Sequence, residues 1–279
     1  MIINFEKMEG LGNDFVIIDD RKGAISKDHD QEKNSFYAEL AVKLCSRNFG
    51  IGADGIILLL ESEKEDAGFR IFNSDGSEAQ MCGNGMRCFA KYLFEKKIID
   101  KKRFTVETLA GVVIPEVITN ESGIVESIRV DMGIPAFEPD QSSFELSVNG
   151  QSFHLTAVSM GNPHAVIFVN NLMDTDVELH GRAIENHPKF PEKTNVEFIE
   201  MVNPSQMKMR VWERGAGETL ACGTGACAAL VAACINEKSE RKAQIELKGG
   251  TLDIEWRASN NHIYKTGPAR SVFTGNIEV

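Results

Sequence analysis

The chain contains the segment Arg70-Ile-Phe-Asn-Ser-Asp-Gly-Ser-Glu-Ala-Gln-Met-Cys82-Gly-Asn-Gly and, 140 residues later and without a gap, the segment Arg210-Val-Trp-Glu-Arg-Gly-Ala-Gly-Glu-Thr-Leu-Ala-Cys222-Gly-Thr-Gly. The cysteines and the glycine pairs that follow them coincide. Two further pairs match in the same order at offsets of 149 and 139 residues: Gly12–Ile18 with Gly161–Ile167, and Val106–Gly111 with Ile245–Gly250. Solenoid repeats have periods of about 20 to 50 residues, so this longer period indicates two homologous halves.

Short β-branched and aromatic runs, most of them bounded by turn residues, predict strands in both halves. The predicted strands are Asp14–Asp19, Ile56–Leu60, Phe69–Phe72, Phe104–Glu107, Ser127–Asp131, His164–Val169, Val196–Met201, Met207–Trp212 and Thr251–Trp256. Apolar residues recur at helical spacing in Ser35–Cys45 and Gly85–Lys97. A third helix is expected at Gly225–Ile235, which is apolar all round and should be buried on every side.

The repeat and the mixture of elements predict an α+β fold with two domains related by a pseudo-two-fold axis. Each domain is expected to be a strongly bent, barrel-like and mostly antiparallel sheet around a central helix, with the active site in the cleft between the domains. The polar stretch Thr119–Gly123 indicates the boundary. Residues 1–124 plus 268–279 should therefore form the N-terminal half, and residues 125–267 the C-terminal half.

Each half places one cysteine on a glycine-rich loop directly before a helix. The first turn of a helix has unpaired N–H groups and carries roughly half a positive charge. Such a site binds an anion, for example a carboxylate, and lowers the pKa of a neighbouring thiol. The glycines let the backbone approach a ligand closely, because no Cβ is in the way.

Two such loops facing each other predict a chemical function. Both helix starts would hold one carboxylate, and Cys82 and Cys222 would stand on opposite sides of its α-carbon. One thiolate removes the α-proton while the other thiol donates one, and the held carboxylate takes up the developing negative charge. The pattern therefore predicts a two-base inversion of stereochemistry, and no cofactor is expected.

Composition and charge narrow the remaining classes. The formal net charge of −11 argues against non-specific nucleic-acid binding. No apolar run approaches the roughly 20 residues of a membrane span, and the N-terminus has no signal-peptide pattern, so a cytoplasmic protein is expected. The six cysteines form no Cys-x-x-Cys pair, and Cys45, Cys88, Cys227 and Cys234 are interpreted as core residues. No metal is expected, because no metal-ligand spacing occurs at His29, His154, His180, His187 and His262.

Several long motifs together resemble the diaminopimelate epimerase family. They are Met8-Glu-Gly-Leu-Gly-Asn13-Asp-Phe, Arg47-Asn-Phe-Gly-Ile-Gly-Ala-Asp-Gly55, Asn73-Ser-Asp-Gly-Ser-Glu-Ala-Gln-Met-Cys82-Gly-Asn-Gly-Met-Arg-Cys88, Gly161-Asn-Pro-His164, Thr194-Asn195-Val-Glu-Phe and Gly215-Ala-Gly-Glu-Thr-Leu-Ala-Cys222-Gly-Thr-Gly. The resemblance covers essentially the whole chain. It implies a pyridoxal-independent isomerase that interconverts LL- and meso-diaminopimelate for lysine and, in many bacteria, peptidoglycan synthesis. It also implies a homodimer.

The resemblance also implies roles for individual residues. Cys82 and Cys222 would be the acid/base pair, with the bound isomer deciding which one deprotonates it. His164 and Glu213 would tune the two thiols, and Arg214 would clamp the distal carboxylate of the substrate. The remaining implied substrate ligands are Asn13, Asn73, Gly83, Asn84, Asn162, Asn195, the backbone near Glu213, Gly223 and Thr224. Gly55 is one departure, because some family members carry a glutamine there. Arg70 and Arg210 are interpreted as structural.

Three alternatives stay open at the level of the sequence. Proline racemase or 4-hydroxyproline epimerase would share the architecture, but a cyclic amino acid has no second charged end for Arg214 to bind. A non-catalytic two-lobed amino-acid-binding protein would have no need of two thiols. A cysteine-dependent redox protein lacks the expected Cys-x-x-Cys.

Overall fold

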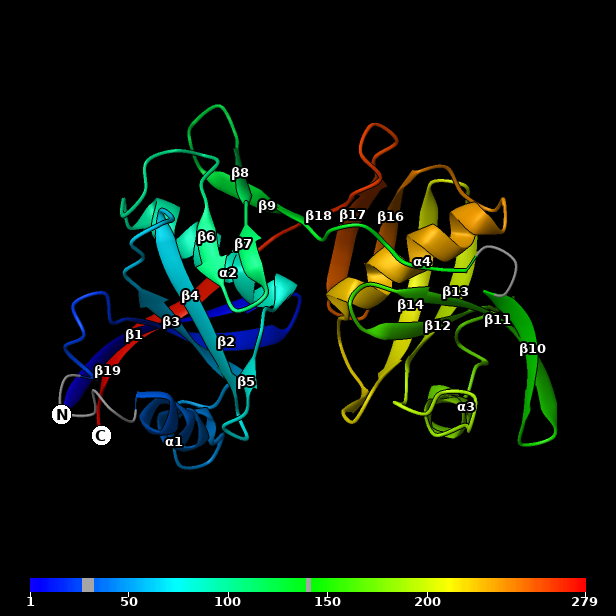
Figure 1. Cartoon of the computed structure of the whole chain (residues 1–279), viewed down its shortest axis with the longest axis horizontal. Coiled ribbons are helices and arrows are strands. Elements are labelled where there is room, and N and C mark those ends of the chain that lie inside the picture. Colours follow the sequence, from blue (N-terminus) through cyan, green and yellow to red (C-terminus); the bar gives the residue numbers. More distant parts are fainter. Residues whose placement is uncertain (27–32, 139–141) are drawn as a thin grey trace. The chain divides into compact units, whose positions relative to one another are not determined.

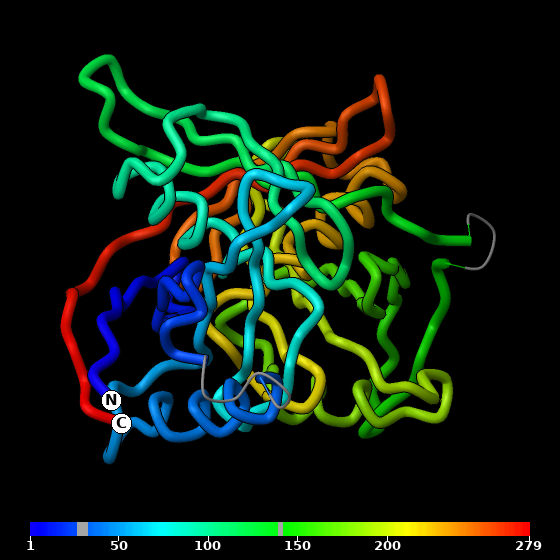
Figure 2. Tube along the Cα trace, turned by 60° about the vertical axis from the view of Figure 1, so that its left-hand side comes forward, coloured from blue at the N-terminus to red at the C-terminus, as the bar shows by residue number. Residues whose placement is uncertain are grey.

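A computed structural model describes residues 1–26, 33–138 and 142–279, and the chain divides into two compact units (Figure 1). Unit 1 comprises Met1–Val130 and Gly267–Val279, and unit 2 comprises Asp131–Thr266. The C-terminal strand thus belongs to the first unit. Met1 N donates to Val279 O at 3.0 Å, so the two termini lie side by side (Figure 2).

In its described residues, unit 1 contains ten strands and two helices. The strands are β1 (Ile2–Gly10), β2 (Asn13–Asp19), β3 (Gly55–Leu60), β4 (Ala67–Asn73), β5 (Glu78–Ala79), β6 (Val106–Thr108), β7 (Gly111–Val113), β8 (Glu116–Thr119), β9 (Val125–Asp131, whose last residue is assigned to unit 2) and β19 (Arg270–Glu278); the helices are α1 (Lys33–Cys45) and α2 (Gly83–Glu95). The main sheet has the order β19-β1-β2-β3-β4-β6-β7, and β5 pairs with β4.

The part of unit 2 that the structure describes contains nine strands and two helices. The strands are β10 (Ser143–Val148), β11 (Gln151–Ser159), β12 (Pro163–Phe168), β13 (Asn195–Asn203), β14 (Gln206–Glu213), β15 (Gly217–Glu218), β16 (Lys242–Leu247), β17 (Gly250–Trp256) and β18 (Ile263–Gly267, whose last residue is assigned to unit 1); the helices are α3 (Val177–Glu185) and α4 (Gly223–Ile235). Its strands follow the order β10-β11-β12-β13-β14-β16-β17-β18.

The two units repeat one topology. From β19 to β7 in unit 1, and from β10 to β17 in unit 2, the successive pairings are antiparallel, antiparallel, parallel, antiparallel, parallel and antiparallel. The C-terminal strand β19 occupies in unit 1 the place that β10 occupies in unit 2. The predicted duplication and α+β class are confirmed. Each sheet is mixed, although most of its pairings are antiparallel as expected.

The polar stretch Thr119–Gly123 forms a hairpin turn rather than the passage between the units. Asn120 Oδ1 accepts hydrogen bonds from Ser122 N and Ile124 N at 3.0 Å each, and Gly123 has a φ of +78°. An Asx-type turn of this kind reverses the chain from β8 to β9. The units divide after this hairpin, at Val130 and Asp131, and again at Thr266 and Gly267.

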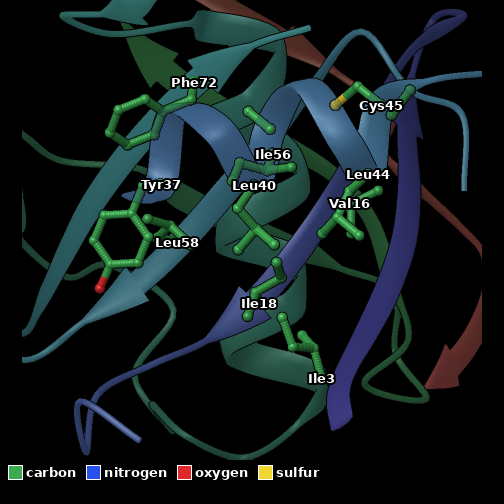
Figure 3. Close-up of a cluster of buried hydrophobic side chains, with 12 residues drawn as sticks. Ile3, Val16, Ile18, Tyr37, Leu40, Leu44, Cys45, Ile56, Leu58 and Phe72 are labelled. Carbon is green, nitrogen blue, oxygen red and sulfur yellow. The ribbon is translucent and has the colours of Figure 1, made fainter. Parts of the chain in front are cut away.

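Each sheet carries a helix on both faces, which explains its continuous apolar strands. In β3, Ile56 and Leu58 pack in one cluster with Tyr37 and Leu40 of α1 (Figure 3). The intervening Ile57 points the other way, since its Cδ1 lies 3.0 Å from where a Cβ on Gly85 of α2 would stand. All of Ile56–Leu59 is fully buried.

Unit 2 has the same layers, with α3 in the place of α1 and α4 in the place of α2. Val177 and Ile184 of α3 pack with Ala165, Val196 and Phe198 of the sheet. The sequence analysis did not predict α3, a helix of nine residues. α4 contacts β11, β12, β13, β16 and β17, and its buried residues run from Gly223 to Ala233 with only Thr224 partly exposed, as its apolar composition predicted. In the described residues, no helix is long and apolar enough to span a membrane.

Candidate active site: two cysteines at helix N-termini

Both predicted acid/base cysteines are the N-cap residues of their helices. Cys82 precedes α2 with φ −135° and ψ 117°, and Cys222 precedes α4 with φ −115° and ψ 111°. Each sulfur accepts a hydrogen bond from the backbone N–H three residues later, at 3.4 Å from Gly85 and 3.3 Å from Gly225. The sequence prediction of a cysteine at each helix start is confirmed, and the helices begin two residues earlier than expected.

The third residue of each helix is a glycine because the helix start lies directly on the sheet. A Cβ on Gly85 would stand 3.0 Å from Ile57 Cδ1 in β3, and one on Gly225 would stand 2.6 Å from Glu197 Oε1 in β13. Real Cβ contacts are essentially never that short in the second case. The same comparison shows that Ile57 and Glu197 occupy equivalent places in the two units.

In unit 1, a chain of side-chain amides surrounds Cys82. Its sulfur donates to Asn13 Oδ1 at 3.9 Å, and Asn84 Nδ2 donates to the same oxygen at 3.2 Å. Asn84 is held in turn by the fully buried Arg87, whose Nη1 donates to Asn84 Oδ1 at 2.9 Å. Asn13 Nδ2 donates to Asp54 Oδ2 at 2.7 Å. These bonds fix both predicted asparagines beside the first cysteine.

Asn73 lies at the end of β4, exposed, with its Nδ2 donating to Ser77 Oγ at 2.9 Å. It pairs across the ladder with Gly55. A Cβ on Gly55 would stand 2.6 Å from the carbonyl oxygen of Phe72, so any side chain there requires the backbone to move. The departure from the glutamine of some family members is therefore built into this strand pair.

In unit 2, a longer hydrogen-bonded path leads away from Cys222. Its sulfur lies 3.6 Å from Thr224 Oγ1, which accepts from Asn162 Nδ2 at 3.4 Å. Asn162 Oδ1 lies 3.1 Å from Nε2 of the buried His164. The opposite ring nitrogen, Nδ1, is 2.7 Å from Glu197 Oε1. Because a carboxylate only accepts, Nδ1 carries the proton of that bond.

Cys222 does not show the lowered pKa that its helix start suggested. Burial raises the pKa of the Cys222 thiol well above that of an ordinary cysteine, and the Glu213 and Glu197 carboxyls raise it further. The Gly225 N–H favours the thiolate but is outweighed. Burial also raises the pKa of the Glu213 carboxyl, with Glu197 adding to the effect, while the Thr219 hydroxyl donates to Glu213 Oε1. Desolvation thus overrides the helix field here.

Arg214 and Asn195 are joined at the end of β14. Asn195 Oδ1 accepts from Arg214 N at 3.0 Å, and its Nδ2 donates to Pro163 O at 2.9 Å. The carboxamide therefore holds the Arg214 backbone in place. The guanidinium is exposed, and among the described residues it bonds the carbonyl of Glu192 at 3.1 Å. Its remaining donors can reach a ligand carboxylate.

The family model of diaminopimelate epimerase matches residues 5–138 and 156–272. The chain belongs to the diaminopimelate epimerase family. The diaminopimelate epimerase of Desulforapulum autotrophicum is 56% identical, covering 100% of both chains. Those of Heliobacterium modesticaldum and Pelotomaculum thermopropionicum are 48% and 49% identical, with 99% and 98% of each chain covered.

Solved structures with more distant sequences share the family's fold. A phenazine biosynthesis protein of the PhzF family from Bacillus anthracis superposes with a TM-score of 0.70 at 20% identity, covering 100% of both chains. A hydroxyproline epimerase from Agrobacterium vitis gives 0.70 at 16% identity, covering 99% of this chain and 92% of that one. These similarities confirm the two-domain α+β fold.

Outside the implied family site, Cys45, Cys88 and Cys227 are buried as predicted, whereas Cys234 is only partly buried. Arg70 and Arg210 bond Glu78 and Glu218 at equivalent places in the two units. Burial raises the pKa of the Cys45 and Cys88 thiols to about 12, and that of Cys234 to about 11. Cys227 is fully buried. His262 pairs with Asp131 at 2.8 Å, and His29 lies outside the described residues.

Sequence reasoning missed Arg87, Asp54 and Glu197, which hold the predicted family residues in place. For Glu197 a signal was present, since a charged residue stands between Val196 and Phe198 in an otherwise apolar strand. The 140-residue repeat also places it opposite Ile57 of the first half. A repeat position that is apolar in one half and acidic in the other indicates a role that the fold alone does not require.

Proposed function

We propose that this chain is a diaminopimelate epimerase, which interconverts LL- and meso-2,6-diaminopimelate without a cofactor in lysine and peptidoglycan-precursor biosynthesis. The observation that carries the proposal is the pair of cysteine N-caps, Cys82 and Cys222. They have the same backbone geometry in two halves of one duplicated fold. The full-length relatives that share about half of the sequence support the substrate.

In the proposed mechanism, the two helix starts hold the carboxylate of the reacting centre through the N–H groups of Gly83, Asn84, Gly223 and Thr224. Cys82 and Cys222 then flank the α-carbon from opposite sides. One thiolate takes the α-proton, the carboxylate gathers the charge that remains, and the opposite thiol returns a proton with inverted geometry. The raised pKa of Cys222 makes it the protonated partner in the ligand-free enzyme.

The second amino-acid centre of the substrate needs recognition without reaction. The exposed Arg214 guanidinium suits a bidentate carboxylate. Asn13, Asn73, Asn162 and Asn195, with the backbone at Glu213, complete the proposed polar lining. Within this set, Asn195 acts on the substrate partly through Arg214, because its own oxygen holds the Arg214 backbone.

A test follows product formation in deuterium oxide, with reduced protein and LL-diaminopimelate and without pyridoxal phosphate. The expected result is meso product carrying solvent deuterium at one α-carbon. The same assay with proline and 4-hydroxyproline addresses the runner-up function, which the fold of hydroxyproline epimerase suggests. Turnover of a cyclic substrate without turnover of diaminopimelate would replace the proposed substrate, and no exchange from any amino acid would refute the epimerase.

We also propose a cytoplasmic homodimer. The edge strand β19 and its neighbour β1 expose apolar side chains at Ile2, Val272 and Phe273, with exposed fractions of 69%, 54% and 46%. An exposed apolar edge strand is a surface that a second copy can cover. Sedimentation velocity of the wild type should give a dimer, and Phe273→Asp should shift it toward the monomer. A monomeric wild type at micromolar concentration contradicts this assembly.

A further inference from the structure

We infer that Glu197 is a positioning residue of the second acid/base site, which orients His164 and keeps Cys222 in its protonated form. The inference rests on the proposed epimerase function, since it assigns Cys222 the role of the acid. Glu197 lies on β13 and is fully buried. No residue role implied by the family motifs includes it.

The bonding of Glu197 is one-sided. Its Oε1 accepts from His164 Nδ1 at 2.7 Å, while its Oε2 has no hydrogen-bond partner among the described residues. A buried carboxylate with one unsatisfied oxygen is costly. A core position usually avoids that cost with an apolar side chain, so the carboxylate here indicates a role other than packing.

Unit 1 provides the matched apolar case. The place of Glu197 is taken there by Ile57, and the place of His164 by Phe15. Both are buried, and the same sheet, helix start and cysteine N-cap form without any charge beneath them. The acid–imidazole pair is therefore dispensable for the fold and distinguishes the surroundings of the second cysteine.

The groups around Cys222 in unit 2 explain the effect. His164 comes from β12, Glu197 from β13 and Glu213 from β14, and the cysteine itself begins α4. A thiolate would add a third acidic group next to the Glu197 and Glu213 carboxyls, and both carboxyls disfavour its charge. The bond from Nδ1 to Glu197 also sets the ring orientation, so that Nε2 faces Asn162 and, through Thr224, the thiol.

The proposed reaction changes the protonation state of Cys222. When Cys82 takes the α-proton, the Cys222 S–H bond breaks as the new Cα–H bond forms, and the negative charge moves to the Cys222 sulfur. Glu197 disfavours that product state of the enzyme. Return to the resting state then moves one proton from Cys82 back to Cys222 through solvent, with no net change in atoms or charge.

The first experiment measures the rate at which iodoacetamide alkylates Cys222, by mass spectrometry of its peptide, between pH 6 and 10 without substrate. Glu197→Gln has nearly the shape of the wild type but lacks the charge, so its rate profile should move to lower pH. A shift of one pH unit corresponds to about tenfold faster alkylation at a pH below the titration. Glu246→Gln, an exposed change of the same kind on β16, should leave the Cys222 profile unchanged.

An unchanged Cys222 profile in folded Glu197→Gln would overturn the inference. If that variant does not fold, nitrogen NMR of the wild type decides, with His164 assigned by comparison with His164→Gln. The proton is expected on Nδ1, and a neutral ring with its proton on Nε2 would overturn the proposed contact. Neither measurement uses the substrate. A shifted profile in a protein that fails to epimerise diaminopimelate would therefore refute the proposed function and the acid role of Cys222, but not the effect of Glu197 on the Cys222 thiol.

Discussion

The start of α2 and the start of α4 share a backbone but differ in chemistry. Both begin with a cysteine N-cap that accepts a hydrogen bond from a glycine N–H. Beneath the first lies Ile57, and beneath the second lies Glu197. The first cysteine meets Asn13, while the second lies 5% exposed beside two carboxyls. A helix N-terminus therefore does not by itself decide the ionisation of its thiol. At Cys222, burial and the two neighbouring carboxyls raise the pKa against the field of the helix.

The largest effect is expected from removing either cysteine of the proposed acid/base pair. Cys82→Ala and Cys222→Ala each remove one of the two proton carriers, so the rate of epimerisation should fall by about 10⁴-fold, the upper range for one acid/base group. Steady-state assays in both directions measure it. Cys234→Ala, a change on the same helix α4 outside the proposed site, is the control and should retain activity. Substantial turnover by either single variant would contradict a two-thiol mechanism.

Next in size is the loss of the clamp that only unit 2 provides. Arg214→Met removes the guanidinium while the backbone N–H that Asn195 holds is kept. Loss of a charge-assisted bidentate contact of about 3 kcal/mol corresponds to roughly 10²-fold in kcat/KM for diaminopimelate. Arg182→Met, on the exposed side of α3, is a matched control. Equal kcat/KM in Arg214→Met and the wild type would exclude the distal-carboxylate role.

The glycines at the third position of α2 and α4 allow the two helix starts to be compared directly, because each faces a side chain of the strand beneath it. Gly225→Ala would place a methyl 2.6 Å from the Glu197 carboxylate and 3.2 Å from the Cys222 sulfur, whereas Gly85→Ala meets the flexible end of Ile57 at 3.0 Å. Gly225→Ala should therefore lose more stability, about 2 kcal/mol, and about tenfold in kcat. Urea unfolding and initial rates measure both variants. A greater loss for Gly85→Ala would mean that the packing under the two helices is not as described.

The smallest expected effect is a difference in titration. A raised pKa means that Cys222 remains a thiol through neutral pH and ionises only above the pH at which an ordinary cysteine does. Thiolate absorbance near 240 nm, taken as wild type minus Cys222→Ala, should therefore appear only above about pH 9. A Cys222 signal that titrates near pH 7 would show that the helix field prevails over burial and the two carboxyls.

Local pattern was sufficient to predict much of the fold. All nine predicted strands and all three predicted helices are present, because continuous apolar runs and helical periodicity reflect layers that are buried on both faces. Ten strands of the described residues were not predicted: β1, β5, β7, β8, β10, β11, β15, β16, β18 and β19. The helix α3 was also missed, although its buried Val177, Gly181 and Ile184 recur at helical spacing. The boundary suggested at Thr119–Gly123 is a hairpin turn, and a polar turn and a polar linker have the same composition.

Some features of the candidate site could likewise be predicted from the sequence, and others could not. The motif order and the duplication alone indicated two cysteines at two helix starts, since a cysteine followed by Gly-x-Gly and an apolar segment is a local signal. The asparagine contacts of Asn13 and Asn162 could be expected only from family resemblance. The supporting residues Arg87 and Asp54 could not be expected at all, because a hydrogen bond between distant residues leaves no periodic pattern.

The amino-acid order was thus enough to establish the duplicated architecture, the two thiols and the family, because each depends on residues that are neighbours in the chain. The ionisation of Cys222 required the folded structure. Glu197, His164 and Glu213 come from three separate strands and meet the thiol only after packing. Electrostatic interactions depend on distance and on the exclusion of water, and both are set by that packing.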